Sequence, residues 1–304
     1  MLTVSALEFM NKFIIFPFLR LLSRLPLCLL YLKSDFFYFL VYKIFRYRVK
    51  VVRQNLKNSF PDKPEKWLQQ TEKKFYRHLC DIAAEEIFMW GANTEKMRKH
   101  LEYQHLDVFS ELHSKGKDII ILFGHYCNWE WNAFVPQDLP NNLYEVGTLY
   151  QKLHNADFDG LLCEIRSKFG VNLVNQKSVL RKIVENRRKK QPLALAFIAD
   201  QSPWSKNAHY WTTFLNRQTT FLTGWEEIAK KFDCAVIYVD MRKTTRGKYV
   251  YAPEILCENP QDLPQYALTE MYVRRLEQNI LIEPAYWLWS HKRWKVKPPT
   301  LEHR

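Results

Sequence analysis

The chain has 304 residues, of which 47% are hydrophobic, so it is long enough to bury the core of one large domain or two small ones. Only 8 glycines occur, and none builds a GxGxxG or a GxxxxGK[ST] motif, which excludes the usual backbone cradles for a dinucleotide or a nucleoside triphosphate. Forty-five Lys and Arg against 32 Asp and Glu give a net charge of +13, which favours anionic lipids, acidic proteins or nucleic acid as partners.

The N-terminal stretch from residue 13 to residue 45 is strongly apolar and indicates contact with a membrane. It reads FIIFPFLRLLSRLPLCLLYLKSDFFYFLVYKIF, and charged residues interrupt it before any uncharged run reaches the roughly 18 residues of a spanning helix. The basic run KIFRYRVKVVR overlaps its end and suits anionic head groups. We expect residues 1–45 to be a membrane-anchoring helical segment that lies in the interface or inserts shallowly and is not a removable signal peptide. The alternative is a pair of ordinary core helices.

Residues 46–304 are expected to form one α/β domain with a mostly parallel central sheet flanked by helices. A helical spacing of apolar residues covers residues 65–90. Beyond it, apolar runs of strand length alternate with amphipathic stretches, which is typical of a parallel sheet. The predicted strands are 118–123, 144–149, 193–199, 235–240 and 249–253. The predicted helices are 157–169, 178–190, 223–232 and 264–278.

The stretch DIIILFGHYCNWEW, residues 118–131, holds the strongest candidate for a catalytic group. A histidine followed five positions later by a carboxylate occurs three times. Of these histidines only His125 comes directly after the last apolar residues of a predicted strand and Gly124, at a carboxyl end of the sheet, where open α/β folds place their ligands. If a helix begins after the strand, Glu130 lies in its first turn and can orient the imidazole as a general base. The alternative is a structural histidine with a surface glutamate.

Two other chemistries are less well supported by the same stretch. Cys127 could be a nucleophile activated by His125, but a spacing of two residues does not readily aim a thiol at the ring, so packing is the favoured role. The 6 cysteines form no CxxC pair and no HExxH motif occurs, so we expect reduced thiols, no metal and no cofactor.

Motifs along nearly the whole chain resemble the bacterial late acyltransferases of lipid A biosynthesis, within the lysophospholipid acyltransferase superfamily. In chain order these motifs are RVKVVRQNLKNSFPDK, FGHYCNWEW, YQKLHN, IRSKFG, FIADQSP, FLTG and PAYWLWSHKRWK. Any one of them is weak, but their order and spacing together are specific. The stretch ADQSPWSKNAHYWTTFLN is most similar to the branch found in Bacteroidetes-type bacteria.

The resemblance implies transfer of a fatty acyl chain from a thioester, on acyl carrier protein, to a hydroxyl of a lipid A precursor. His125 would take the hydroxyl proton, Glu130 would hold the ring, and Arg166 would stabilise the oxyanion or hold a phosphate. The remaining residues that it implies, as contacts for the substrate, are Asn128, Lys152, Asp200 and Gln201. The enzyme would work at the cytoplasmic face of the inner membrane, in contact with membrane lipids.

One departure from the family pattern leaves the acceptor open. Where many members carry Tyr-Arg-Pro, this chain has Tyr150, Gln151 and Lys152. Another lysolipid, containing an amino acid or built on glycerol, is therefore the alternative acceptor, although the Glu-Gly-Thr-Arg block of the glycerolipid enzymes is missing. A non-catalytic binder of membrane or nucleic acid is the alternative of a different class, but no nucleic-acid-binding motif occurs, so we expect no nucleic-acid partner.

Overall fold

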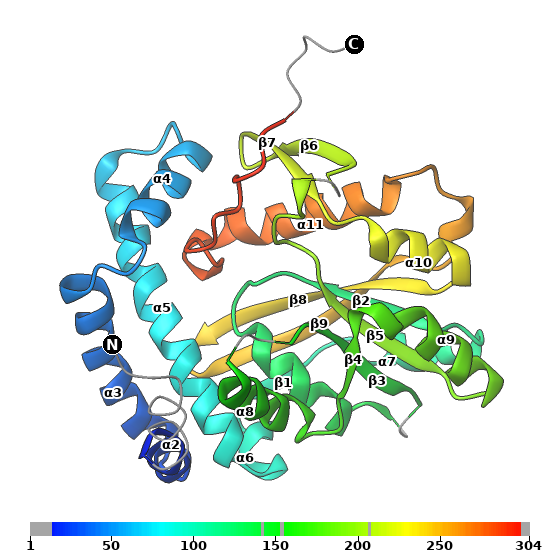
Figure 1. The fold of residues 1–304 in the computed structure, drawn as a ribbon, viewed down its shortest axis with the longest axis horizontal. Coiled ribbons are helices and arrows are strands. Elements are labelled where there is room, and N and C mark those ends of the chain that lie inside the picture. The colour runs from blue at the N-terminus through cyan, green and yellow to red at the C-terminus, as the bar shows by residue number, and fades with distance from the viewer. Residues whose placement is uncertain (1–13, 141–142, 153–154, 206–207, 299–304) are drawn as a thin grey trace.

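The structure is a computed structural model that describes residues 14–140, 143–152, 155–205 and 208–298. Its centre is a seven-stranded sheet in the order β1-β9-β8-β2-β5-β3-β4 (Figure 1). All neighbouring strands are parallel except β8 and β9, which form an antiparallel pair, so the expected mostly parallel sheet is confirmed. The strands are β1 (Leu101–Tyr103), β2 (Ile119–Phe123), β3 (Glu145–Tyr150), β4 (Asn172–Asn175), β5 (Leu193–Ile198), β8 (Ala235–Thr245) and β9 (Lys248–Cys257).

The helices that flank the sheet lie close to their predicted positions. They are α5 (Glu65–Gly91), α8 (Ala156–Ser167), α9 (Val179–Arg188), α10 (Gly224–Phe232) and α11 (Ala267–Ile282). The sequence did not predict strands β1 and β4, the short helices α6 (Thr94–Arg98) and α7 (Asp107–Ser114), or the separate hairpin of β6 (Tyr210–Phe214) and β7 (Arg217–Phe221). In Figure 1 this hairpin lies above the sheet, next to α11.

The middle strands β2 and β5 are apolar because helices cover both of their faces. All five residues of β2 are buried, and so are five of the six residues of β5. Such continuous apolar runs are typical of parallel strands inside an α/β sheet. One face of this pair carries α11, which approaches so closely that a Cβ on Gly124 would lie 2.6 Å from a Leu276 methyl carbon. Glycine at position 124 therefore allows the chain to leave β2 beneath α11.

The other face carries a 3-10 helix, η3 (Trp129–Gln137), which follows β2 directly. Asn128 caps its first turn by accepting a hydrogen bond from the backbone N–H of Trp131 at 3.2 Å. Glu130 lies in this first turn, as the sequence predicted. The segment after β2 thus carries three candidate site residues, His125, Asn128 and Glu130, between the end of the strand and the first turn of η3.

The N-terminal helices lie outside α5, at the left of Figure 1. They are α2 (Phe16–Leu22), α3 (Leu27–Tyr38), a π-helical turn (Phe39–Ile44) and α4 (Val49–Ser59). Leu22, Leu27 and Leu30 pack into the common core, and α2 approaches α5 so closely that a Cβ on Gly91 would lie 1.9 Å from the carbonyl oxygen of Ser23. The described part of the expected anchor segment is therefore joined to the α/β domain along one side.

The opposite side of these helices exposes apolar side chains. The largest exposed fractions are 72% for Phe45, 67% for Leu32 and 61% for Leu21. Across the described ranges, we find no helix with the length and apolar character needed to cross a membrane. Residues 1–13 of the expected anchor lie outside the described residues.

Candidate active site

Two neighbouring strands, β2 and β5, bring His125 and Asp200 to the same point. Phe123 is paired with Ile198 where these parallel strands end, so the residues two positions further along each strand emerge side by side. His125 Nδ1 lies 2.6 Å from Asp200 Oδ1, and the backbone N–H of His125 donates to Asp200 Oδ2 at 2.9 Å. The register of the sheet thus builds an imidazole–carboxylate pair at its carboxyl edge.

Asp200 is held as an ionised carboxylate. Its residue is 2% exposed, and Trp287 Nε1 donates a hydrogen bond to Oδ2 at 2.8 Å. Burial by itself raises the pKa of Asp200, but the facing His125 and the hydrogen bonds from His125 and Trp287 outweigh it and lower the pKa to about 2. An ionised carboxylate can only accept, so Nδ1 of His125 carries a proton, and in the neutral form of this ring the lone pair lies on Nε2.

The Nε2 atom of His125 faces the side-chain amide of Gln201. The two nitrogen atoms lie 3.1 Å apart, a distance at which the amide N–H can donate to the ring. The ring also makes a T-shaped contact with Trp129, with 5.2 Å between the centroids, and the His125 side chain is 15% exposed. The basic nitrogen is therefore oriented by its neighbours and still lies near the surface.

Glu130 forms a separate ion pair with Arg166. Arg166 donates from Nε to Glu130 Oε2 at 2.8 Å and from Nη2 to Oε1 at 2.6 Å. Burial alone lowers the pKa of Arg166, but the hydrogen bonds and charge of Glu130 raise it above its usual range, so the guanidinium stays cationic. Within the described residues His125 and Glu130 share no hydrogen bond, and the ring contact that the sequence assigned to Glu130 is made by Asp200.

A cavity of about 90 Å³ lies beside the Glu130–Arg166 pair, and both residues line it. Most of its wall is apolar and comes from the face of the sheet opposite α11, with η3 as its cover. The aliphatic and phenylalanine side chains of the sheet in this wall are Ile121, Phe123, Val146, Leu149, Leu173, Ala196 and Ile198. Trp129 lies both in the wall and against His125, so the cavity and the imidazole are adjacent.

The other predicted site residues lie in different surroundings. Asn128 is fully buried and donates from Nδ2 to Glu85 Oε2 at 2.6 Å, so its side chain points into the protein. Lys152 is exposed and follows Tyr150, which lines the cavity. Cys127 is also fully buried, and burial raises the pKa of its thiol well above the usual range, which is consistent with packing and not with a nucleophile.

Sequence reasoning missed two groups at this site. Trp287, within the PAYWLWSHKRWK motif, donates to Asp200, but nothing in the motif indicates which of its aromatic residues does so. Glu86 of α5 has a buried carboxyl oxygen, Oε1, without a hydrogen-bond partner among the described residues. Burial first, and then the charge of Glu130, raise the pKa of Glu86 to about 8, whereas Arg166 lowers it. The helical spacing of apolar residues in α5 did not indicate that the Glu86 carboxyl group would be buried beside the Glu130–Arg166 pair.

The fold and the site define an α/β protein with a His125–Asp200 pair beside a largely apolar cavity, and comparison with known proteins gives its family. A family model for bacterial lipid A biosynthesis acyltransferases matches residues 3–296. The chain is also similar to a lipid A biosynthesis acyltransferase of Haemophilus influenzae, with 21% identity over 260 residues, 84% of this chain and 80% of that protein. The chain belongs to the bacterial lipid A biosynthesis acyltransferase family and is an acyltransferase. The Bacteroidetes-type branch stays a prediction.

Proposed function

We propose that this protein transfers a fatty acyl chain from an acyl thioester to a hydroxyl group of a lipid A precursor, with His125 as the general base. The observation that carries the proposal is the His125–Asp200 pair beside an apolar cavity that a cation lines. A neutral imidazole with its lone pair on Nε2 can take the proton of a hydroxyl group. The apolar wall suits a hydrocarbon chain, and the cation suits the charge that develops in acyl transfer.

In the proposed reaction the acceptor hydroxyl attacks the thioester carbonyl directly. His125 Nε2 takes the hydroxyl proton as the new C–O bond forms, and Asp200 stabilises the imidazolium through Nδ1. The tetrahedral intermediate collapses with cleavage of the C–S bond, and His125 returns the proton to the leaving thiolate. No covalent enzyme intermediate is needed, which agrees with the buried, protonated thiol of Cys127.

Arg166 is proposed to stabilise the oxyanion or to hold a phosphate of the acceptor. Glu130 grips the guanidinium through two of its N–H groups, so the planar group has a fixed direction at the cavity wall. In this account Glu130 acts through Arg166, whereas Asp200 acts through His125. Gln201 and Lys152 are proposed substrate contacts, since Gln201 faces the basic nitrogen and Lys152 is exposed next to the cavity-lining Tyr150.

The exposed apolar surface of α2, α3 and the following turn is proposed to lie in the lipid head-group region at the cytoplasmic face of the inner membrane. Phe45, Leu32 and Leu21 would enter the lipid, and the exposed Lys43, Arg46 and Lys50 would meet anionic head groups. Acyl carrier protein is the proposed donor, because the acidic surface of such a carrier suits a protein with a net charge of +13.

The test of the proposed function is an acyl-transfer assay with purified protein in mixed vesicles, read by mass spectrometry. Acyl carrier protein thioester and coenzyme A thioester are each offered with a lipid A precursor, with a glycerol-based lysolipid and with an amino-acid-containing lysolipid. We expect transfer from the carrier-protein thioester to the lipid A precursor. Transfer to one of the lysolipids alone would replace the proposed acceptor, and no transfer to any of the three would contradict the proposal.

A further inference from the structure

The turn that carries His125 into η3 has an unfavourable backbone conformation. Cys127 has a φ of 53°, in the left-handed region that residues other than glycine, asparagine and aspartate rarely adopt. A residue held in this region costs on the order of 1–3 kcal/mol, so it persists only where surrounding contacts hold it. Cys127 lies between His125 and Glu130 in the chain. The contacts that hold Cys127 therefore also hold the backbone that positions these two side chains.

Hydrogen bonds to both the N–H group and the carbonyl group of Cys127 hold this turn. The N–H of Cys127 donates to the carbonyl oxygen of Tyr286 at 3.0 Å, and His78 Nε2 lies 3.2 Å from the carbonyl oxygen of Cys127. His78 is 3% exposed, and burial lowers its pKa well below the usual value, so the ring is neutral and donates from Nε2. Its Nδ1 faces Lys243 Nζ at 3.4 Å, and the ammonium can donate to it.

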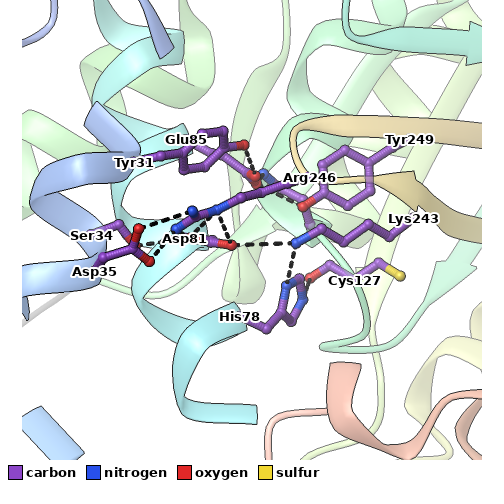
Figure 2. Close-up of polar contacts among 11 residues, drawn as sticks. Tyr31, Ser34, Asp35, His78, Asp81, Glu85, Cys127, Lys243, Arg246 and Tyr249 are labelled. Atoms are coloured by element: carbon purple, nitrogen blue, oxygen red, sulfur yellow. Dashed lines mark hydrogen bonds and ion pairs between the residues drawn. The ribbon is translucent and has the colours of Figure 1, made fainter. Parts of the chain in front are cut away.

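A buried carboxylate holds the next residue of the turn. Glu85 is fully buried and accepts hydrogen bonds from the Tyr249 hydroxyl at 2.8 Å and from the Tyr31 hydroxyl at 2.5 Å (Figure 2). It also accepts a hydrogen bond from Asn128 Nδ2 at 2.6 Å. Asn128 also caps η3 with its Oδ1 atom. Glu85 and His78 both belong to α5, so one helix holds two successive residues of the turn.

We propose that His78, Glu85 and Asn128 form a positioning clamp that keeps the turn at Cys127 in its unfavourable conformation and thereby sets the direction of His125. None of the three touches the reacting atoms in this account. The proposal rests on the proposed function, in which His125 is the base. It reassigns Asn128 from a substrate contact to a residue that acts through the backbone.

The outer half of the same buried polar cluster supplies a matched control. Ser34 donates to Asp81 Oδ1 at 2.8 Å, and Arg246 bridges Asp81 and Asp35 (Figure 2). These contacts fasten α3 and the β8–β9 hairpin to α5 without touching the turn. Ser34 of α3 is 3% exposed, as His78 is, so Ser34→Ala removes an equally buried hydrogen bond to a residue of α5.

The clamp is tested by steady-state kinetics of His78→Ala, His78→Gln, Asn128→Ser and Ser34→Ala in the full chain. We expect His78→Ala and Asn128→Ser to lower kcat about tenfold or more while both KM values change less than about twofold, because misplacement of a base by about 1 Å costs up to 100-fold. His78→Gln keeps an N–H donor of similar reach and should recover most of kcat. Ser34→Ala should keep kcat within about twofold of the wild-type value, even if it lowers the melting temperature as much as His78→Ala or Asn128→Ser does.

Amide hydrogen exchange of the peptide covering residues 124–131 gives a readout that does not depend on acyl transfer. Exchange should accelerate in His78→Ala and Asn128→Ser and stay unchanged in Ser34→Ala. If His78→Ala does not fold, Asn128→Ser carries the test, since serine is a good helix cap but is too short to reach Glu85. A raised KM with unchanged kcat in Asn128→Ser, or losses of kcat that follow melting temperature in all variants, would overturn the clamp. Absence of transfer by the wild-type protein would instead overturn the proposed function, with the exchange data still testing the clamp.

Discussion

The two ends of the segment His125–Glu130 illustrate different ways of using a carboxylate. At the first end, two parallel strands place Asp200 against the imidazole, and the register of the sheet sets the 2.6 Å contact. At the second end, helices η3 and α8 place Glu130 against Arg166 through two parallel hydrogen bonds. The comparison shows that neighbours in a motif need not be partners in space. In the proposed reaction, proton transfer falls to the pair at the strand ends and charge stabilisation falls to the pair between the helices.

The largest effect is expected at the base itself. His125→Ala should lower kcat by about a hundred- to ten-thousand-fold, the usual contribution of general-base catalysis, while fold and vesicle binding stay intact. The measurement is initial-rate acyl transfer together with circular dichroism and vesicle flotation. Cys127→Ser serves as the comparison variant and should keep most of the activity. Turnover near the wild-type rate in His125→Ala would contradict the base assignment.

Removal of the cation tests the helical end. Arg166→Gln should lower kcat by about a hundred- to a thousand-fold if the guanidinium stabilises the oxyanion, because that charge is present only in the transition state. If it binds a phosphate of the acceptor, the acceptor KM should rise instead while the donor KM stays constant. Full activity with unchanged KM values for both substrates would remove Arg166 from the site.

A smaller effect is expected for the basic residues beside the N-terminal helices that are proposed to face lipid. Replacing Lys43, Arg46 and Lys50 with Gln should weaken binding to anionic vesicles by about 3 kcal/mol at low salt, near 1 kcal/mol per charge, and hardly change binding to neutral vesicles. Arg48 is spared because its Nη1 atom donates to the carbonyl oxygen of Ser290 at 3.0 Å. Equal weakening by a variant that neutralises Arg188, Lys189 and Lys190 on the far surface would show that only total charge matters.

The smallest effect concerns the stability of the protein near the Glu130–Arg166 pair. The folded state raises the pKa of Glu86 to about 8 from 4.5, so its stabilising contribution is fully present below about pH 4.5 and is lost as the pH rises through 8. Glu86→Gln has no carboxyl group to deprotonate, so it should not lose this stability as the pH rises. Its melting temperature should exceed that of the wild type by about 2–4 °C per kcal/mol gained, and the difference in melting temperature should grow from pH 5 to pH 8. Glu95→Gln, at an exposed ion pair, should show no such trend.

The sequence predicts where the strands lie better than it predicts which strands pair with each other in the sheet. The apolar runs of β2 and β5 are visible as local patterns, and so is the position of His125 just beyond β2. That β5 lies next to β2, and so brings Asp200 to His125, depends on packing between segments about 75 residues apart, which no local pattern encodes. Glu130 pairs with Arg166 for a similar reason, since the turn of η3 decides where its side chain points.

The β8–β9 hairpin shows how tertiary contacts extend an element beyond its apolar pattern. The sequence predicts strands 235–240 and 249–253, but the strands continue to Thr245 and begin at Lys248. The polar tip resembles a loop in sequence. It is ordered because Lys243 and Arg246 meet the buried carboxylate of Asp81 on α5. The short strands β1 and β4 were missed because three or four residues show too little alternation.

The most direct test of the central claim is a pair of double-mutant cycles for kcat, measured by prolonged acyl-transfer assays with mass-spectrometric detection. One cycle combines His125→Ala with Asp200→Asn, and the other combines His125→Ala with Glu130→Gln. Because Asp200 acts through His125, Asp200→Asn should cost about 10–100-fold alone and almost nothing once His125 is removed. Glu130→Gln should lower the rate by a similar factor in both backgrounds. The reverse result, with Glu130 silent and Asp200 costly in the His125→Ala background, would show that Glu130 is the partner of the base and would contradict the account.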